Sequence, residues 1–107
     1  MSDRLNFSDI ERNATPQSIE RGREYYEWGQ VQSIVRRGSL LQASVMGQSE
    51  PWYETFLDVE RCEGDCSCPY DWGGWCKHIV ALALTYLNDS EQIENRFSLD
   101  ELIERLI

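Results

Sequence analysis

The amino-acid sequence predicts a small α+β domain that a metal ion helps to hold together. Three observations predict it: a capped helical pattern near the start, three consecutive segments of strand-like alternation, and a cysteine-rich loop followed by an almost wholly apolar helix. A chain of 107 residues forms one domain with a modest core, at a size where a metal site adds useful stability. We therefore expect residues 1–107 to be a single domain.

The first predicted element is a helix over residues 16–28. Thr15 is a suitable N-cap, and Pro16 suits the first helical position because the N–H that proline lacks would have no partner there. Gly29 follows the helix and suits a left-handed C-cap. Gly22 lies inside the helix, where glycine costs about 1 kcal/mol relative to alanine. Its position therefore predicts close packing against a neighbouring element.

Three strands follow, over residues 31–36, 40–46 and 52–59. A short loop that contains Gly38 joins the first two, which is typical of a hairpin. Side chains alternate along each segment, as they do in strands with one buried face. In the first strand the more apolar face carries Val31, Ser33 and Val35. In the third strand one face carries Tyr53, Thr55, Leu57 and Val59. We expect the three strands to form an antiparallel sheet.

The helix after the cysteine-rich loop covers residues 78–87 and is apolar almost all round. A helix of this kind is buried on more than one side, so we expect it to pack between the sheet and the first helix. Residues 88–90 end this helix. A C-terminal helical tail is predicted over about residues 90–107, where Ser98 and Glu101 have the spacing of a capping box.

The cysteine-rich loop contains a set of metal ligands. Cys66 and Cys68 form one pair and Cys76 and His78 form the other, with one residue inside each pair and seven between the pairs. Alternate residues of an extended segment point to the same side, so each pair can reach one ion. Three thiolates and one imidazole are the ligands of a structural, tetrahedral Zn²⁺ site. The sequence predicts one such zinc ion and no catalytic residue, because a catalytic zinc keeps one position open.

Cys62, the remaining cysteine, lies four residues before Cys66. We interpret it as a spare thiol near the end of the third strand. Two alternatives are that it competes as a zinc ligand, or that it forms a reversible disulfide with Cys66 or Cys68. The second alternative makes a thiol redox switch a third hypothesis for the function.

These residues resemble the SWIM zinc finger, whose pattern is CxC, a variable spacer and CxH. Cys66-x-Cys68-Pro69, Gly73-Gly74 and Cys76-Lys77-His78 carry the resemblance, and residues 21–31 resemble the helix-to-strand entry of many bacterial members. The resemblance spans about residues 15–87, with the finger core at about 52–87. It implies zinc binding and a role as a DNA- or protein-interaction module, often attached to Swi/Snf-type helicases or to transposase-like proteins.

The charge distribution opposes unspecific binding to DNA. The net charge is −9. Residues 1–49 contain six basic and six acidic residues, whereas residues 50–107 contain four basic and thirteen acidic ones. Because unspecific duplex binding depends on Lys and Arg that neutralise phosphates, a finger in the acidic half would repel a phosphate backbone.

Two groups of residues are candidates for an interaction surface. Tyr70, Trp72 and Trp75 could stack on unpaired bases or anchor a protein partner, or they could form a small core that covers the metal. The second group is basic and forms either a patch or a solvated, salt-bridged face among neighbouring glutamates; it comprises Arg21, Arg23, Arg36 and Arg37.

The leading hypothesis is a non-catalytic, zinc-binding module that interacts with a protein partner or an attached helicase-type domain. The alternative is direct binding of DNA or single-stranded nucleic acid through the arginines and the loop aromatics. We expect no small-molecule substrate. The apolar run 79–87 is too short to span a membrane, the polar N-terminus has no signal-peptide core, and the cysteines suit reduced thiols. These features predict a cytoplasmic protein without a membrane partner.

Overall fold

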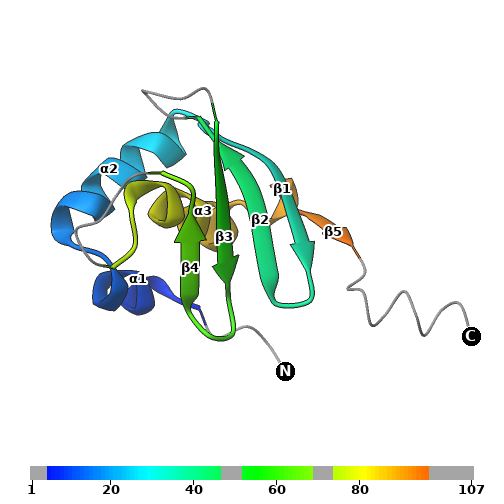
Figure 1. Ribbon diagram of the computed structural model, residues 1–107, viewed down its shortest axis with the longest axis horizontal. Coiled ribbons are helices and arrows are strands. Elements are labelled where there is room, and N and C mark those ends of the chain that lie inside the picture. Colours follow the sequence, from blue (N-terminus) through cyan, green and yellow to red (C-terminus); the bar gives the residue numbers. More distant parts are fainter. Residues whose placement is uncertain (1–4, 47–51, 69–73, 97–107) are drawn as a thin grey trace, which may run out of the picture.

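The structure is a computed structural model, and it describes residues 5–46, 52–68 and 74–96. Three α-helices, one 3₁₀ turn and five strands occupy these ranges (Figure 1). In chain order they are α1 Phe7–Asn13, α2 Pro16–Glu27, β1 Val31–Arg37, β2 Leu40–Val45, β3 Tyr53–Asp58, β4 Glu63–Cys66, α3 Lys77–Asn88, η1 Ser90–Gln92 and β5 Glu94–Arg96. The predicted α+β class is confirmed.

The strands form one sheet in the order β4-β3-β2-β1-β5. The first four are antiparallel neighbours, and β5 pairs in parallel with the end of β1. Two strands more than the predicted three are therefore present. β4 lies at the start of the cysteine-rich loop, where a short segment of charged residues and Gly64 gives no strand-like alternation. β5 is three residues long and is a strand because it pairs with β1.

The C-terminal prediction is corrected where the structure describes it. Residues 90–96 form a 3₁₀ turn and a strand rather than the beginning of a helical tail. Ile93 is buried between these two elements, which ties the segment to the core. The predicted capping box at Ser98 and Glu101 lies outside the described residues.

The core lies between the sheet and the helices, which are on one side of it (Figure 1). α3 is its centre: all its residues from His78 to Thr85 are buried, which confirms the prediction of a helix covered on several sides. The sheet contributes one face of β2 and one of β3. Tyr53, Thr55 and Leu57 of β3 are buried, as is Val59 just after it, so the predicted alternation of this segment is confirmed. Along the described ranges, no helix combines the length and the apolar character that crossing a bilayer requires.

α2 has the predicted caps. The Thr15 side chain accepts a hydrogen bond from the Ser18 N–H, Pro16 begins the helix, and Gly29 adopts a φ of 69° just after its end. Gly22 faces α3, where a β-carbon would collide with the Val80 side chain and approach the Lys77 carbonyl oxygen to 2.9 Å. Close packing at Gly22 is therefore confirmed, and it lets α2 lie directly against α3.

The inward face of β1 differs from the predicted one. Ser33 has a φ of 54°, and the register with β2 shifts between Gln32 and Val35. This β-bulge reverses the alternation, so Ile34 is buried while Ser33 is exposed. The predicted face of Val31, Ser33 and Val35 is thus wrong after its first residue.

Candidate metal centre

The four predicted ligands come from two elements that the fold brings together. Cys66 ends β4 and Cys68 follows it, whereas Cys76 is the N-cap of α3 and His78 lies in its first turn. β4 can approach α3 because Gly64 has no side chain; an added β-carbon would lie 2.7 Å from Ile79. The site therefore joins the edge of the sheet to the central helix.

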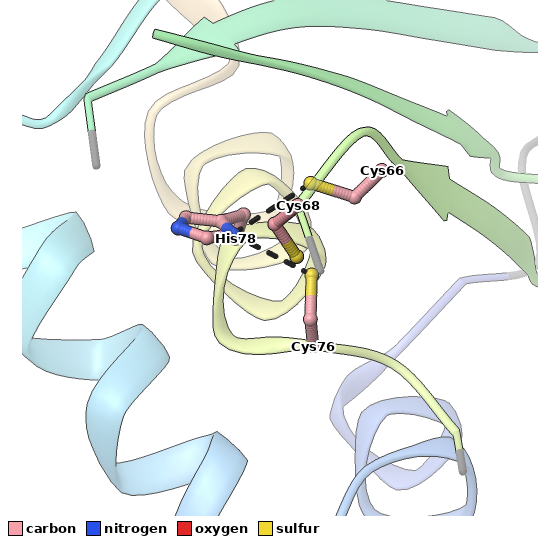
Figure 2. Close-up of side chains that lie close together, drawn as sticks. All are labelled: Cys66, Cys68, Cys76 and His78. Carbon is pink, nitrogen blue, oxygen red and sulfur yellow. Dashed lines mark hydrogen bonds between the residues drawn. The ribbon is translucent and has the colours of Figure 1, made fainter. Parts of the chain in front are cut away.

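The donor atoms converge on one point. The three sulfur atoms and an imidazole nitrogen all lie within 4.8 Å of one another, and Figure 2 shows the side chains turned toward a common centre. His78 Nδ1 is 3.6 Å from Cys66 Sγ and 3.7 Å from Cys76 Sγ. Tetrahedral zinc with ordinary Zn–S and Zn–N bonds places sulfur and nitrogen ligands about 3.6 Å apart. The four residues therefore fit one zinc ion in donor type and in spacing.

The imidazole of His78 is enclosed by aromatic rings. Its ring centroid is 4.8 Å from that of Tyr53 and 5.4 Å from that of Tyr25. Nδ1 faces the sulfur atoms, while Nε2 is buried and has no hydrogen-bond partner among the described residues. Nδ1 is consequently the nitrogen that would bind zinc, and the tyrosine rings fix the orientation that a hydrogen bond to the other nitrogen usually provides.

Hydrogen bonds favour a thiolate at Cys66. The contact with Cys76 is the main cause that lowers the pKa of Cys66 to about 3, and contacts with His78 and Thr55 add to it against the opposing effect of burial. The Thr55 hydroxyl lies 3.4 Å from Cys66 Sγ. The same contact with Cys66, together with burial, raises the pKa of Cys76. The cluster thus holds negative charge at the centre that a cation would occupy.

A hydrogen bond to the first helix supports the second ligand pair. The Trp75 main-chain N–H donates to the Asn13 carbonyl oxygen at 2.7 Å. Gly74 has a φ of 75° and passes so close to Asn13 that a β-carbon there would collide with the same carbonyl oxygen. α1 was not predicted from the sequence, although Asn6 and Asp9 form a capping box at its start. That spacing could have identified it.

Cys62 does not belong to the cluster. The four-residue group with ligand spacing contains Cys66, Cys68, Cys76 and His78, whereas Cys62 precedes β4 at its opposite end. Burial is the main cause that raises the pKa of the Cys62 thiol, with Asp9 of α1 as the next. Its place outside the cluster, before β4 and at the end of that strand opposite to Cys66, favours the interpretation as a spare thiol.

The candidate surface residues differ in how far they are exposed. Trp75 is only 5% exposed and is part of the core, so it offers no contact surface. Tyr70 and Trp72 lie outside the described residues. Arg37 is exposed, while the Arg36 guanidinium lies 5.7 Å from the Tyr86 ring of α3.

Comparison with known proteins agrees with this geometry. Residues 53–87 match the family model of the SWIM zinc finger. An uncharacterized protein of Methanocaldococcus jannaschii is 33% identical over 89 residues, which cover 78% of this chain and 37% of that protein. The chain thus spans well under half the length of this relative. No solved structure matches the chain.

Proposed function

We propose that this chain, which carries a SWIM zinc finger at residues 53–87, is a non-catalytic protein-interaction module linked to DNA-acting machinery such as Swi/Snf-type helicases. The observation that carries the proposal is the position of the zinc ligands. They connect β4 to α3, the central helix of the core. Zinc at this point stabilises the folded domain, and structural zinc binding is worth on the order of 10–16 kcal/mol.

The ligand set supports a structural rather than a catalytic metal. Three thiolates and one imidazole complete a tetrahedron, so no position is left for water or substrate. Trp75, Cys76 and His78 are all buried, and the neighbouring tyrosine rings further exclude solvent. The SWIM finger is a binding module, and we extend this to the whole chain as a non-enzymatic protein of the reducing cytoplasm.

The positions of the arginines favour a protein over a nucleic acid as the partner. Arg21 and Arg23 are exposed on α2 together with Glu20 and Glu27. Arg37 is the last residue of β1, and β1 begins just after α2 ends. A seven-residue strand spans about 23 Å, so Arg37 lies that far along the sheet from the junction with α2. The four arginines of the alternative hypothesis are therefore spread over two elements, and the net charge of −9 opposes approach to phosphates.

The proposal is tested with the zinc-loaded full chain. Cross-linking in the native cells should identify a protein that contacts this chain, and the purified partner should bind the zinc-loaded wild type but not Cys76→Ser. Fluorescence anisotropy with labelled single- and double-stranded DNA at low salt is the parallel measurement. Tight DNA binding that weakens steeply with salt, without a direct protein contact, would support the nucleic-acid alternative instead.

A further inference from the structure

The sheet has one face that no described helix covers (Figure 1). Leu41, Ala43 and Val45 of β2 are buried against the helices, so the residues between them point to the opposite side. The register pairs these outward residues with outward residues of β3: Leu40 with Asp58, Gln42 with Phe56, and Ser44 with Glu54. We call this side of β1–β4 the open face.

The open face carries large apolar side chains. Five large hydrophobic residues are exposed in the described part of the chain, and three of them lie on or directly beside this face: Leu40 at 41%, Met46 at 40% and Trp52 at 46%. Phe56 lies among them and is half-buried. Aromatic residues and methionine are enriched where proteins bind one another, so this composition is typical of a contact surface.

The open face is also hollowed beside the bulge of β1. The hollow lies over β1 and β2 and reaches Glu54 of β3, whose carboxylate accepts hydrogen bonds from the Gln42 and Ser44 side chains. Its lining consists of Ser33, Val35, Arg37, Gln42, Ala43, Ser44 and Glu54. The recess thus holds one carboxylate, Glu54, and one guanidinium, Arg37, so the surplus negative charge of the open face lies outside it, on Asp58, Glu63 and Asp65.

The charges of the open face select its partner. Glu54 and Asp58 on β3 and Glu63 and Asp65 on β4 are acidic, and the strand register places Glu63 beside Asp58 and Asp65 beside Phe56. Arg37 is the one exposed basic residue within the strands β1–β4, and Arg61 lies in the turn between β3 and β4. Residues 97–107 contain three acidic residues and one basic residue, so their charge does not complement the face. A second copy of the chain, at −9, would also be repelled.

We propose that the open face binds a segment of a partner protein that combines apolar side chains with Lys or Arg. The apolar residues contact Trp52, Met46 and Leu40, and the cationic groups lie against Glu54 and the acids of β3 and β4. This inference rests on the proposed function, because it names the chemistry of the partner that a protein-interaction module would bind.

The test selects peptides from a random library displayed on phage, with the zinc-loaded full chain as bait. Recovered peptides should be rich in Lys, Arg and apolar residues. Titrated into labelled protein, they should shift the amide resonances of Gln42, Ser44 and Phe56. Trp52→Ser should weaken binding about tenfold or more, and Glu54→Lys about threefold at low salt. Glu63→Lys provides a second charge reversal on the same face.

Matched controls lie on the other elements. Phe7→Ser removes an exposed aromatic side chain from α1, and Glu20→Lys reverses an exposed charge on α2; both should bind peptide as the wild type does. Zinc content establishes that each variant is folded. Acidic or neutral peptides, no enriched peptide at all, or resonance shifts confined to α1 and α2 would each overturn this inference and leave the proposed function standing. Competition by single-stranded DNA for the open face would overturn both.

Discussion

The main-chain N–H of Trp75 donates a hydrogen bond to the carbonyl oxygen of Asn13. This contact joins the last residue of α1 to the residue that precedes Cys76, so the first helix holds the second ligand pair in place. The chain comes close enough for this bond because Gly74 has no side chain and adopts a φ of 75°. Zinc binding and the docking of α1 are therefore expected to depend on each other.

Gly74→Ala should lower both domain stability and zinc affinity. Alanine in the left-handed region costs about 1–2 kcal/mol, and its β-carbon would collide with the Asn13 carbonyl oxygen. Gly29→Ala is the control, because Gly29 also has a positive φ but an added β-carbon would meet no atom within 4 Å. Chemical denaturation and competition with a zinc-binding dye measure the two effects. Equal losses of stability and zinc affinity in the two variants would show that the contact with Asn13 contributes to neither.

Gly22→Ala should destabilise the domain although alanine is the better helix former. The new methyl group would be forced against Val80 and the Lys77 carbonyl oxygen, and overpacking of this kind costs about 1–3 kcal/mol. Val80→Ala removes part of the obstruction. The double variant should therefore lose less unfolding free energy than the sum of the losses in the two single variants, by about 0.5 kcal/mol or more. Urea denaturation of the four proteins tests this, and strict additivity would contradict it.

Replacing a ligand should remove zinc, whereas replacing the spare cysteine should not. Cys66→Ser and His78→Ala each remove a donor from the cluster, and we expect both to lose stoichiometric zinc and to unfold at a much lower temperature. Cys62→Ser is the matched control, because Cys62 lies outside the cluster. Native mass spectrometry should find one zinc ion per chain in the wild type and in the control. Zinc loss from Cys62→Ser would instead show that Cys62 is a zinc ligand.

The Cys62 thiol should react slowly with iodoacetamide at pH 7. The rate should rise with pH, and the midpoint of this rise should lie at a higher pH than for an ordinary thiol. Burial and the neighbouring Asp9 carboxylate raise its pKa, so less thiolate is present at a given pH. Because the folded state holds this proton more tightly, the contribution of Cys62 to stability is present below the pKa of the unfolded thiol. It is lost as the pH rises through the folded value.

Mass spectrometry of the alkylated protein measures the rate at Cys62, and Cys62→Ser identifies the modified site. Mild peroxide should leave zinc bound, because Cys62 is at the opposite end of β4 from Cys66. Rapid alkylation of Cys62 at neutral pH, or zinc release with a disulfide from Cys62 to Cys66 or Cys68, would favour the redox hypothesis.

The sequence alone determined the features that depend on near neighbours in the chain. The spacing of Cys66, Cys68, Cys76 and His78 identified the ligand set, since each pair is only two residues apart and needs no distant contact to form. Thr15 and Pro16 marked the start of α2 for the same reason: caps are local hydrogen bonds. The apolar sequence of α3 indicated that the helix is buried.

Only the tertiary structure decided features that depend on residues far apart in the chain. The bulge at Ser33 exchanges the faces of β1, because its register is set by β2 and not by its own alternation. β4 and β5 are too short to be recognised without their partners, and Trp75 is buried because it belongs to a core that residues far apart in the chain form together. Local patterns thus specify the ligands and caps, while pairing and packing choose the surface that the finger presents.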